Sequence, residues 1–337
     1  MNKLLQFANK FEKLLNRLPG PIQKPIEKEW RPLKELFLQR RAPRIVVVGQ
    51  DAETFTHAFL GFQGEIQQDA SGWRVYRNEG EIDFLTLENR AAAGKSAILE
   101  AAPDVFVFLG GPGALEALRE LHQFDRERYN SSAPIIACGG NTAALSEALH
   151  SDATLAKCVE AIITAENREV LLSAIAKVLA DEARLEFARA SGEKAVQTEI
   201  ATTLTRSTAA VCTAIGAQPI PLADMPILTT LQVLLVSGIV HVSGRRLSTK
   251  LVRDFLAALG ANIGAAFLFR EGARAVVKLL PGWGNAISGA VAGAGTYAIG
   301  RAATAYFVEG LSMEQTRQKF RKERKKALPP PQSKSQP

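Results

Sequence analysis

The segment after the first apolar run has the setting of a phosphate-binding loop. Residues 44–49 read RIVVVG, a short apolar pattern typical of a buried strand, and it ends in Gly49. In such a loop backbone N–H groups cradle phosphates, a Lys reaches the β- and γ-phosphates, and a Ser or Thr hydroxyl holds Mg²⁺. The pattern GxxxxGK[ST] maps onto residues 49–56. The candidate phosphate contacts are then Gly49, Gln50, Thr54 and Thr56.

The other residues of this loop argue against phosphate binding. Thr54 stands where the second Gly would be, and Phe55 stands where the Lys would be. Asp51 and Glu53 place carboxylates where phosphate oxygens would lie. Each such like-charge contact at about 4 Å costs on the order of 4 kcal/mol at an effective dielectric of about 20. We therefore expect a vestigial loop, without GTP, GDP or Mg²⁺ as cofactor; the alternative is a divergent but working loop that holds them.

A second loop, Gly94, Lys95 and Ser96, reads GKS and could imitate the end of a phosphate-binding motif. Pro103 limits the helix that could follow it to a few residues, because proline breaks a helix interior. A phosphate-binding helix normally runs for several turns, so we interpret Lys95 as a solvated surface residue.

These loops belong to a region, residues 44–190, in which strand and helix patterns alternate. Such alternation predicts an α/β fold with a mostly parallel sheet and helices on both faces. The strand patterns cover 44–49, 73–76, 82–87, 104–109, 134–138 and 159–164, and the helical patterns cover 54–60, 113–125, 142–149 and 167–189. The strands at 73–76 and 82–87 read as a hairpin.

The order of these elements resembles an Era-like, translation-factor-related P-loop GTPase, with a Ras-like sheet. The resemblance covers 44–190 and lies in the layout, because the motifs are eroded. The DxxG motif would fall near residues 87–89, which read LEN, and the base-reading NKxD would follow strand PIIAC, where the chain reads GGNT. The SAK-like stretch becomes TAE at 164–166. The resemblance implies the GTPase fold without its activity.

Residues 191–310 have a different character, with helical periodicity and many glycines. They resemble the YcjF-like helical domain of unknown function, which is found fused to or encoded beside Era-like GTPases. The matching run is LLPGWGNAISGAVAGAGTYAIGRAATAYFVEG at 279–310. Its helix-packing or association residues would be Gly282, Gly284, Gly289, Gly293, Gly295, Gly300 and Arg301. Members of this family are often membrane-associated, so the resemblance implies membrane or self association.

Small side chains recur along this run at helical spacing, including the GxxxG pair Gly289 and Gly293. Such a stripe lets helices approach closely in bilayers and in soluble cores alike. The uncharged stretches 225–244 and 279–300 have the length of a membrane span, about 20 residues, but are diluted by polar residues. Both readings, packing within a helical bundle and insertion of a hairpin, stay open at this point.

The two ends of the chain are basic. Residues 1–44 carry 11 Lys and Arg against four Glu, and residues 311–337 carry eight against two, in a chain of net charge +7. Residues 1–43 predict two amphipathic helices, which either pack on the body or lie on a membrane. The basic run near 317–326 is expected to extend the last helix, before a disordered tail. The candidate membrane-facing residues are Lys3, Lys10, Lys13, Arg17, Arg321, Lys322, Arg324, Lys325 and Lys326.

Candidate residues for covalent or metal chemistry are few. The three cysteines, Cys138, Cys158 and Cys212, are far apart in sequence and predict reduced thiols in the cytoplasm. His57, His122, His150 and His241 have no Ser, Asp or Cys partner at a recognisable spacing, so no metal site is expected. Residues 125–128, which read DRER, are interpreted as a solvated helix end.

These observations together predict a non-catalytic pseudo-GTPase in four parts: 1–43, 44–190, 191–310 and 311–337. Its expected partners are an anionic membrane surface, a protein or a second copy of itself, at the inner face of the membrane. Nonspecific contact of the C-terminal basic run with nucleic acid is a further possibility, because lysines and arginines there would meet phosphate. The alternative function is a working GTP-binding GTPase.

Overall fold

The computed structural model divides the chain into two compact units. One unit joins Met1–Gln39 to Gln197–Pro337, and the other is Arg40–Val196. The two end segments therefore belong to the same unit. The structure describes residues 3–49, 52, 55, 65–68, 73–77, 83–87, 102–111, 113–139, 142–164, 167–218, 224–260 and 284–327.

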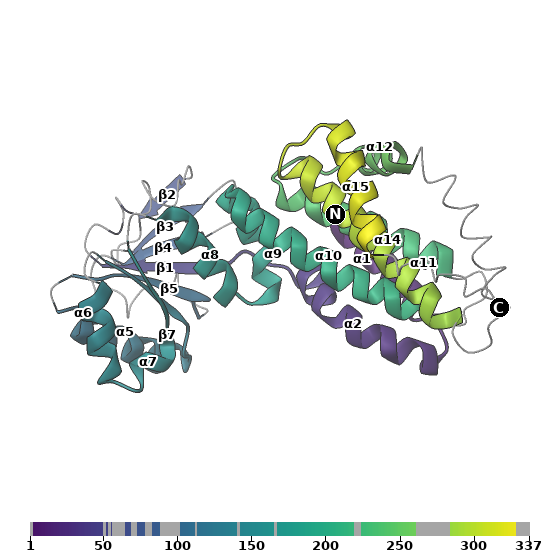
Figure 1. Ribbon diagram of the computed structural model, residues 1–337. Coiled ribbons are helices and arrows are strands. Elements are labelled where there is room, and N and C mark those ends of the chain that lie inside the picture. The colour runs from purple at the N-terminus through teal and green to yellow at the C-terminus, as the bar shows by residue number, and fades with distance from the viewer. Residues whose placement is uncertain are drawn as a thin grey trace, which may run out of the picture. The chain divides into compact units, whose positions relative to one another are not determined.

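The unit Arg40–Val196, called the α/β unit below, is built on a seven-stranded sheet of order β2-β3-β4-β1-β5-β6-β7 (Figure 1). Strands β4, β1, β5, β6 and β7 are parallel, and β2 and β3 complete one edge in antiparallel pairing. The strands are β1 Arg44–Val48, β2 Glu65–Gln68, β3 Trp73–Arg77, β4 Asp83–Leu87, β5 Val105–Leu109, β6 Ile135–Cys138 and β7 Val159–Ile163. The predicted mostly parallel α/β fold is confirmed, and β2 is an addition to it.

Helices cover both faces of this sheet, as the continuous apolar strands require. Alternate strand residues such as Val46, Phe106 and Ile135 pack with Leu118 and Leu121 of α5 in one buried cluster. Helix α8 packs instead on β6 and β7. The helices of this unit are α5 Ala114–Tyr129, α6 Thr142–His150, α7 Leu155–Cys158, α8 Arg168–Val178 and α9 Asp181–Ser191.

The single helix predicted over 167–189 is wrong, because the chain breaks between α8 and α9. Leu179 and Ala180 have extended backbone conformations. The Arg184 guanidinium donates to Lys177 O at 2.9 Å and to Leu179 O at 2.8 Å. A side chain from the second helix thus satisfies carbonyls that end the first, which stabilises the break.

The entry to β1 is fixed by one carboxylate at the start of β5. Asp104 receives two hydrogen bonds from Arg41, at 2.6 and 2.7 Å, and a third from the Arg44 backbone N–H at 2.8 Å. The hydrogen bond and the charge of Asp104 raise the pKa of Arg41 above its ordinary value. This fork–fork geometry ties the segment before β1 to the sheet.

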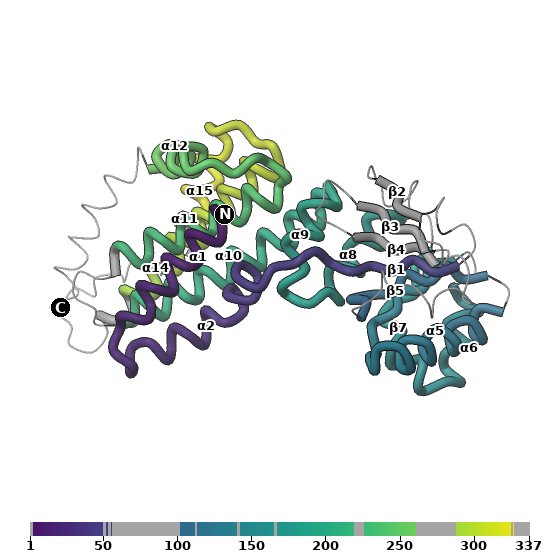
Figure 2. Tube along the Cα trace, turned by 180° about the vertical axis from the view of Figure 1, so that it is seen from behind, coloured from purple at the N-terminus to yellow at the C-terminus, as the bar shows by residue number. Residues whose placement is uncertain are grey.

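The other unit, called the helical unit below, combines both ends of the chain. Figure 2 shows α1 and α2 running beside the helices of the C-terminal part, and α1 packs on α11. Its helices are α1 Lys3–Leu15, α2 Gly20–Leu38, α10 Lys194–Gly216, α11 Asp224–Val242, α12 Thr249–Gly260, α14 Gly284–Phe307 and α15 Met313–Ala327. The apolar stripe of α1, namely Leu4, Ala8, Phe11 and Leu15, is fully or almost fully buried. The two N-terminal amphipathic helices therefore pack on the body with their apolar faces.

The basic run is not an extension of the preceding helix, as predicted, but a separate helix. Val308–Ser312 separates α14 from α15, and Gly310 there has φ +77°, a left-handed conformation that glycine adopts easily. Ser312 and Gln315 then form a capping box: the Ser312 hydroxyl accepts the Gln315 N–H at 3.2 Å, and the Gln315 side chain accepts the Ser312 N–H at 3.0 Å. Helix α15 turns back and packs against α14.

Candidate functional site

The expected phosphate loop begins at Gly49, where β1 ends, and the structure gives this glycine a packing role. Its φ is +141°, and a Cβ placed on it would lie 2.6 Å from Leu109 Cβ and 2.7 Å from Leu109 O. Only glycine avoids that overlap, so the ends of β1 and β5 can approach closely. The close approach accounts for Gly49 without a bound phosphate. Gln50, Thr54 and Thr56 lie outside the described residues, as do Gly94, Lys95 and Ser96 of the second loop.

The carboxyl ends of β5 and β6 border a pocket of about 550 Å³, which is where open α/β sheets bind ligands. Gly139 and Gly110 are in close contact there, because a Cβ on Gly139 would lie 3.3 Å from Gly110 O. The pocket is lined by Gly110, Gly111, Gly113, Ala114, Leu115, Gly139, Thr142, Ala144, Leu145, Ala148 and Ile162. These described lining residues include no ionisable side chain. These residues can therefore surround an apolar group, but the described part of the lining offers no charge to a phosphate.

The small-residue stripe of α14 packs on α10 of the same chain. A Cβ on Gly289 would lie 2.8 Å from Thr213 O, and one on Gly300 would lie 2.8 Å from Thr205 Cβ. Gly293 likewise faces Thr213. Gly295 differs, because its Cβ position meets nothing within 4 Å, so it makes no such close helix contact within the unit, and its role in association stays a prediction.

The remaining predicted residues of this stripe have more limited roles. Arg301 donates to Thr202 Oγ1 at 3.5 Å and so also contacts α10. Gly284 is the first residue of α14. Gly282 lies outside the described residues.

The basic residues of α1 gather on one side of that helix. Lys3, Lys10 and Lys13 are exposed, and at about 100° per residue they fall within about 80° of one another, roughly opposite the buried stripe. Arg17 is exposed just beyond the helix end. Among the described residues none of these four forms an ion pair. We call Lys3, Lys10, Lys13 and Arg17 the basic face.

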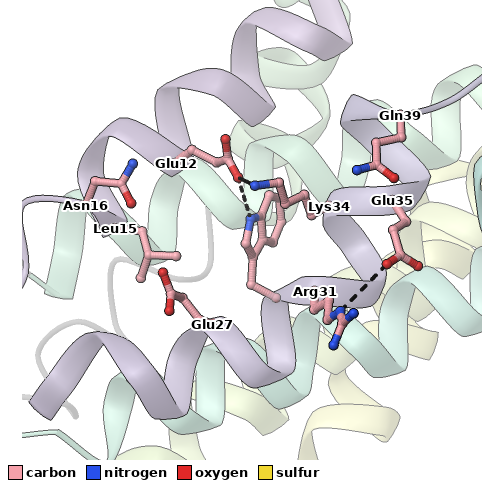
Figure 3. A pocket seen from close by; sticks show the side chains of 9 residues that line it. Glu12, Leu15, Asn16, Glu27, Arg31, Lys34, Glu35 and Gln39 are labelled. Carbon is pink, nitrogen blue, oxygen red and sulfur yellow. Dashed lines mark hydrogen bonds and ion pairs between the residues drawn. The ribbon is translucent and has the colours of Figure 1, made fainter. Parts of the chain in front are cut away.

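Helix α1 carries one acidic residue, Glu12, and it is turned toward α2 (Figure 3). Glu12 Oε1 lies 2.8 Å from Lys34 Nζ and accepts a hydrogen bond from Trp30 Nε1 at 3.5 Å. The groove between the two helices, about 410 Å³, is lined by both acidic and basic side chains. Because Glu12 is engaged there, the basic face has no acid of its own helix beside it.

Helix α15 adds further exposed cations. Arg321, Lys322 and Lys326 are exposed and Arg324 is half-buried, while the side chain of Lys325 lies outside the described residues. Two other basic residues of this helix are engaged in the fold. Lys319 Nζ lies 2.7 Å from Glu309 Oε2, and Arg317 Nε donates to Ala258 O at 3.0 Å.

One group of reactive side chains escaped the sequence prediction. Cys158 Sγ lies 3.6 Å from His122 Nδ1, although 36 residues separate them in the chain. Asp125 is 1 % exposed and accepts the Ala133 N–H at 2.8 Å, so residue 125 does not belong to a solvated helix end. Burial raises the pKa of Asp125 above its ordinary value. The i, i+3 spacing of His122 and Asp125 on one helix was visible in the sequence, but the fold alone brings Cys158 to them.

Neither a membrane span nor a metal site is found among the described residues. No helix there combines the length and the apolar character that crossing a bilayer requires. Helix α11, part of one uncharged stretch considered as a span, buries Leu231, Leu235 and Ile239 within the helical unit. No group of three or more His, Cys, Asp or Glu in the described part of the chain could hold a metal ion.

Comparison with known proteins gives no family assignment. No protein-family model matches the chain, and none of the curated proteins matches it.

Proposed function

We propose that this protein is a non-catalytic scaffold of the pseudo-GTPase kind, which attaches to an anionic membrane surface through its helical unit. In this proposal the α/β unit offers a rigid surface to a protein partner. The Era-like and YcjF-like resemblances are part of the proposal and rest on the residues given above.

The carboxyl edge of the sheet supports the non-catalytic part of this proposal. Gly49 is accounted for by its contact with Leu109, and the neighbouring pocket has no ionisable side chain among its described lining residues. Phosphoryl transfer relies on positioned positive charge, from a Lys, an Arg or Mg²⁺, to stabilise the transferring group. In sequence, Phe55 replaces the Lys of the loop.

The basic face of α1 is the observation that carries the membrane part. Its three helix lysines lie opposite a buried apolar stripe, and Glu12 is paired with Lys34. Such a face can contact lipid headgroups while α1 stays packed on α11. Each Lys or Arg near an anionic membrane contributes about 1 kcal/mol, so the four residues together would favour binding by about 4 kcal/mol at low salt.

Sedimentation with lipid vesicles tests the membrane-binding part of the proposal. The full chain should co-sediment with vesicles that contain phosphatidylserine, should stay in solution with pure phosphatidylcholine, and should be released as salt rises. A variant with Lys3→Gln, Lys10→Gln and Lys13→Gln should lose on the order of 100-fold in partitioning. The matched control replaces Arg126 and Arg128 of α5 and Lys194, the first residue of α10, by Gln, which removes the same charge. Equal binding by the two variants would contradict a role for the basic face.

A nucleotide titration tests the non-catalytic part of the proposal. We expect no saturable binding of a fluorescent GTP analogue with Mg²⁺ up to millimolar concentration. Micromolar binding that is abolished by Thr56→Ala, or by Lys95→Ala, would instead establish a divergent GTPase. This result is independent of the vesicle result, so the two halves of the proposal can fail separately.

A further inference from the structure

The cluster around Cys158 lies at the amino ends of β6 and β7, far along the strands from the carboxyl-edge pocket. Cys158 ends α7 immediately before β7, and His122 belongs to α5. The thiol has three polar neighbours: His122 Nδ1 at 3.6 Å, Ser132 Oγ at 3.3 Å and Thr154 O at 3.5 Å. A thiol beside an imidazole is the arrangement by which proteins activate cysteine nucleophiles, because the imidazole can accept the thiol proton.

Two buried polar atoms of α5 have no hydrogen-bond partner among the described residues. They are His122 Nε2 and Asp125 Oδ1, on side chains that are 9 % and 1 % exposed. Such groups are rare in folded proteins and cost free energy, so each one calls for an explanation. The negative charge of Asp125 acts on His122.

A pocket of about 350 Å³ opens at this cluster. Its lining contains two cations, Lys157 and Lys177, against one carboxylate, Glu160. The volume lies within the range of small-molecule sites, and the charge favours an anionic reagent. Cys158 itself lines the pocket, with Ser132, Pro134 and Val178.

We propose that Cys158 is a reactive thiol that undergoes thiol–disulfide exchange with small anionic disulfides. His122 Nδ1 accepts the thiol proton, and Cys158 Sγ attacks one sulfur of the disulfide. The S–S bond of the reagent breaks, a mixed disulfide forms on Cys158, and the other half leaves as a thiolate. The disulfide is the only oxidant, and each bond formed is matched by a bond broken.

The other two cysteines provide an internal comparison. Cys138 and Cys212 are 1 % and 0 % exposed, and burial raises the pKa of each thiol to about 12. At neutral pH these thiols stay protonated, and the thiolate is the reactive form. Of the three thiols, Cys158 is therefore the one expected to react.

The test treats the native full chain with dithiobis-nitrobenzoate, an anionic disulfide, and follows release of the coloured thiolate. We expect one equivalent to react fast, peptide mapping to place the label on Cys158, and Cys138 and Cys212 to react only after unfolding in guanidinium. Labelling of Cys138 or Cys212 as fast as Cys158, or no fast thiol, would overturn the proposal. This measurement needs no variant.

Two variants test the surroundings of the thiol. With His122→Gln, the reaction rate should fall about tenfold for each pH unit below the ordinary thiol pKa of about 8.5, whereas the wild-type rate should fall less steeply. Replacing Lys157 and Lys177 by Gln should slow the anionic reagent at least threefold and leave neutral dithiodipyridine unaffected. Identical pH profiles in wild type and His122→Gln would refute the role of the imidazole, provided that the variant melts at the wild-type temperature.

Discussion

Two glycines five residues apart on α14 should respond in opposite directions to the same substitution. Alanine favours a helix interior over glycine by about 1 kcal/mol. At Gly295 the added methyl group meets nothing within 4 Å, so Gly295→Ala should stabilise the helical unit by up to about 1 kcal/mol. At Gly300 the same methyl group would overlap Thr205, with its Cβ 2.5 Å from Thr205 Cγ2.

The cost at Gly300 follows from the environment of Thr205. This residue is fully buried, and its hydroxyl donates to Ala201 O at 2.7 Å, so it cannot turn away without losing that bond. Overpacking costs about 1–3 kcal/mol and a lost hydrogen bond about 1 kcal/mol. After the gain in helix propensity, Gly300→Ala should destabilise the protein by about 2 kcal/mol.

Urea unfolding followed by far-UV circular dichroism measures both effects. The two variants should differ by about 3 kcal/mol in the free energy of unfolding. Adding Thr205→Ala to Gly300→Ala should recover at least about 1 kcal/mol relative to the sum of the single changes, as expected for residues in contact. If Gly300→Ala is as stable as wild type, or if the double variant shows no coupling, then α14 does not pack on α10 at this position.

Three further predictions concern single side chains. Ser312→Ala should lower the thermal stability of the helical unit by about 1 kcal/mol, since it removes the N-cap of α15, while Ser312→Thr should retain most of it. Asp104→Asn should cost about 1–2 kcal/mol in urea unfolding because the doubly bonded Arg41 loses its carboxylate; an unchanged midpoint would argue against this contact. Because burial raises the pKa of Asp125, the native state takes up this proton before the unfolded state as the pH falls. The stability of wild type should therefore rise relative to Asp125→Asn between neutral pH and about pH 4, and a constant gap across that range would contradict the burial of this charge.

The sheet was largely predictable because its strands are continuous apolar runs. Strands with apolar residues at every position, such as those that contain Val46 and Phe106, must be buried on both faces of a sheet. Such strands can be recognised from the local sequence alone. Helix ends were less predictable when a side chain of the following helix sets them. The break after α8 depends on the Arg184 side chain reaching back to two carbonyls, whereas the start of α15 had a local signal in Ser312 and Gln315.

Some features of the candidate sites could be predicted from the sequence, and others could not. The eroded motifs could be recognised from residue types, because a missing Lys at position 55 is a matter of sequence. The pairing of His122 with Cys158 could not, because it depends on how α5 and α7 pack over the sheet. The basic face of α1 could not be predicted either. It lacks a neighbouring carboxylate of its own helix because Glu12 pairs with Lys34, and that pairing depends on how α1 packs against α2.

The division of the chain into two units has a consequence for its folding during synthesis on the ribosome. Residues 1–39 share a compact unit with residues from 197 onward, while 40–196 form a unit between them. Helix α1 must therefore wait for α11, and at 5–20 residues per second that delay is roughly 10–40 s. During this delay the apolar face of α1 is exposed, because its native packing partners have not been synthesised. Nascent chains should therefore need a chaperone that binds this face until more than two hundred residues have been made.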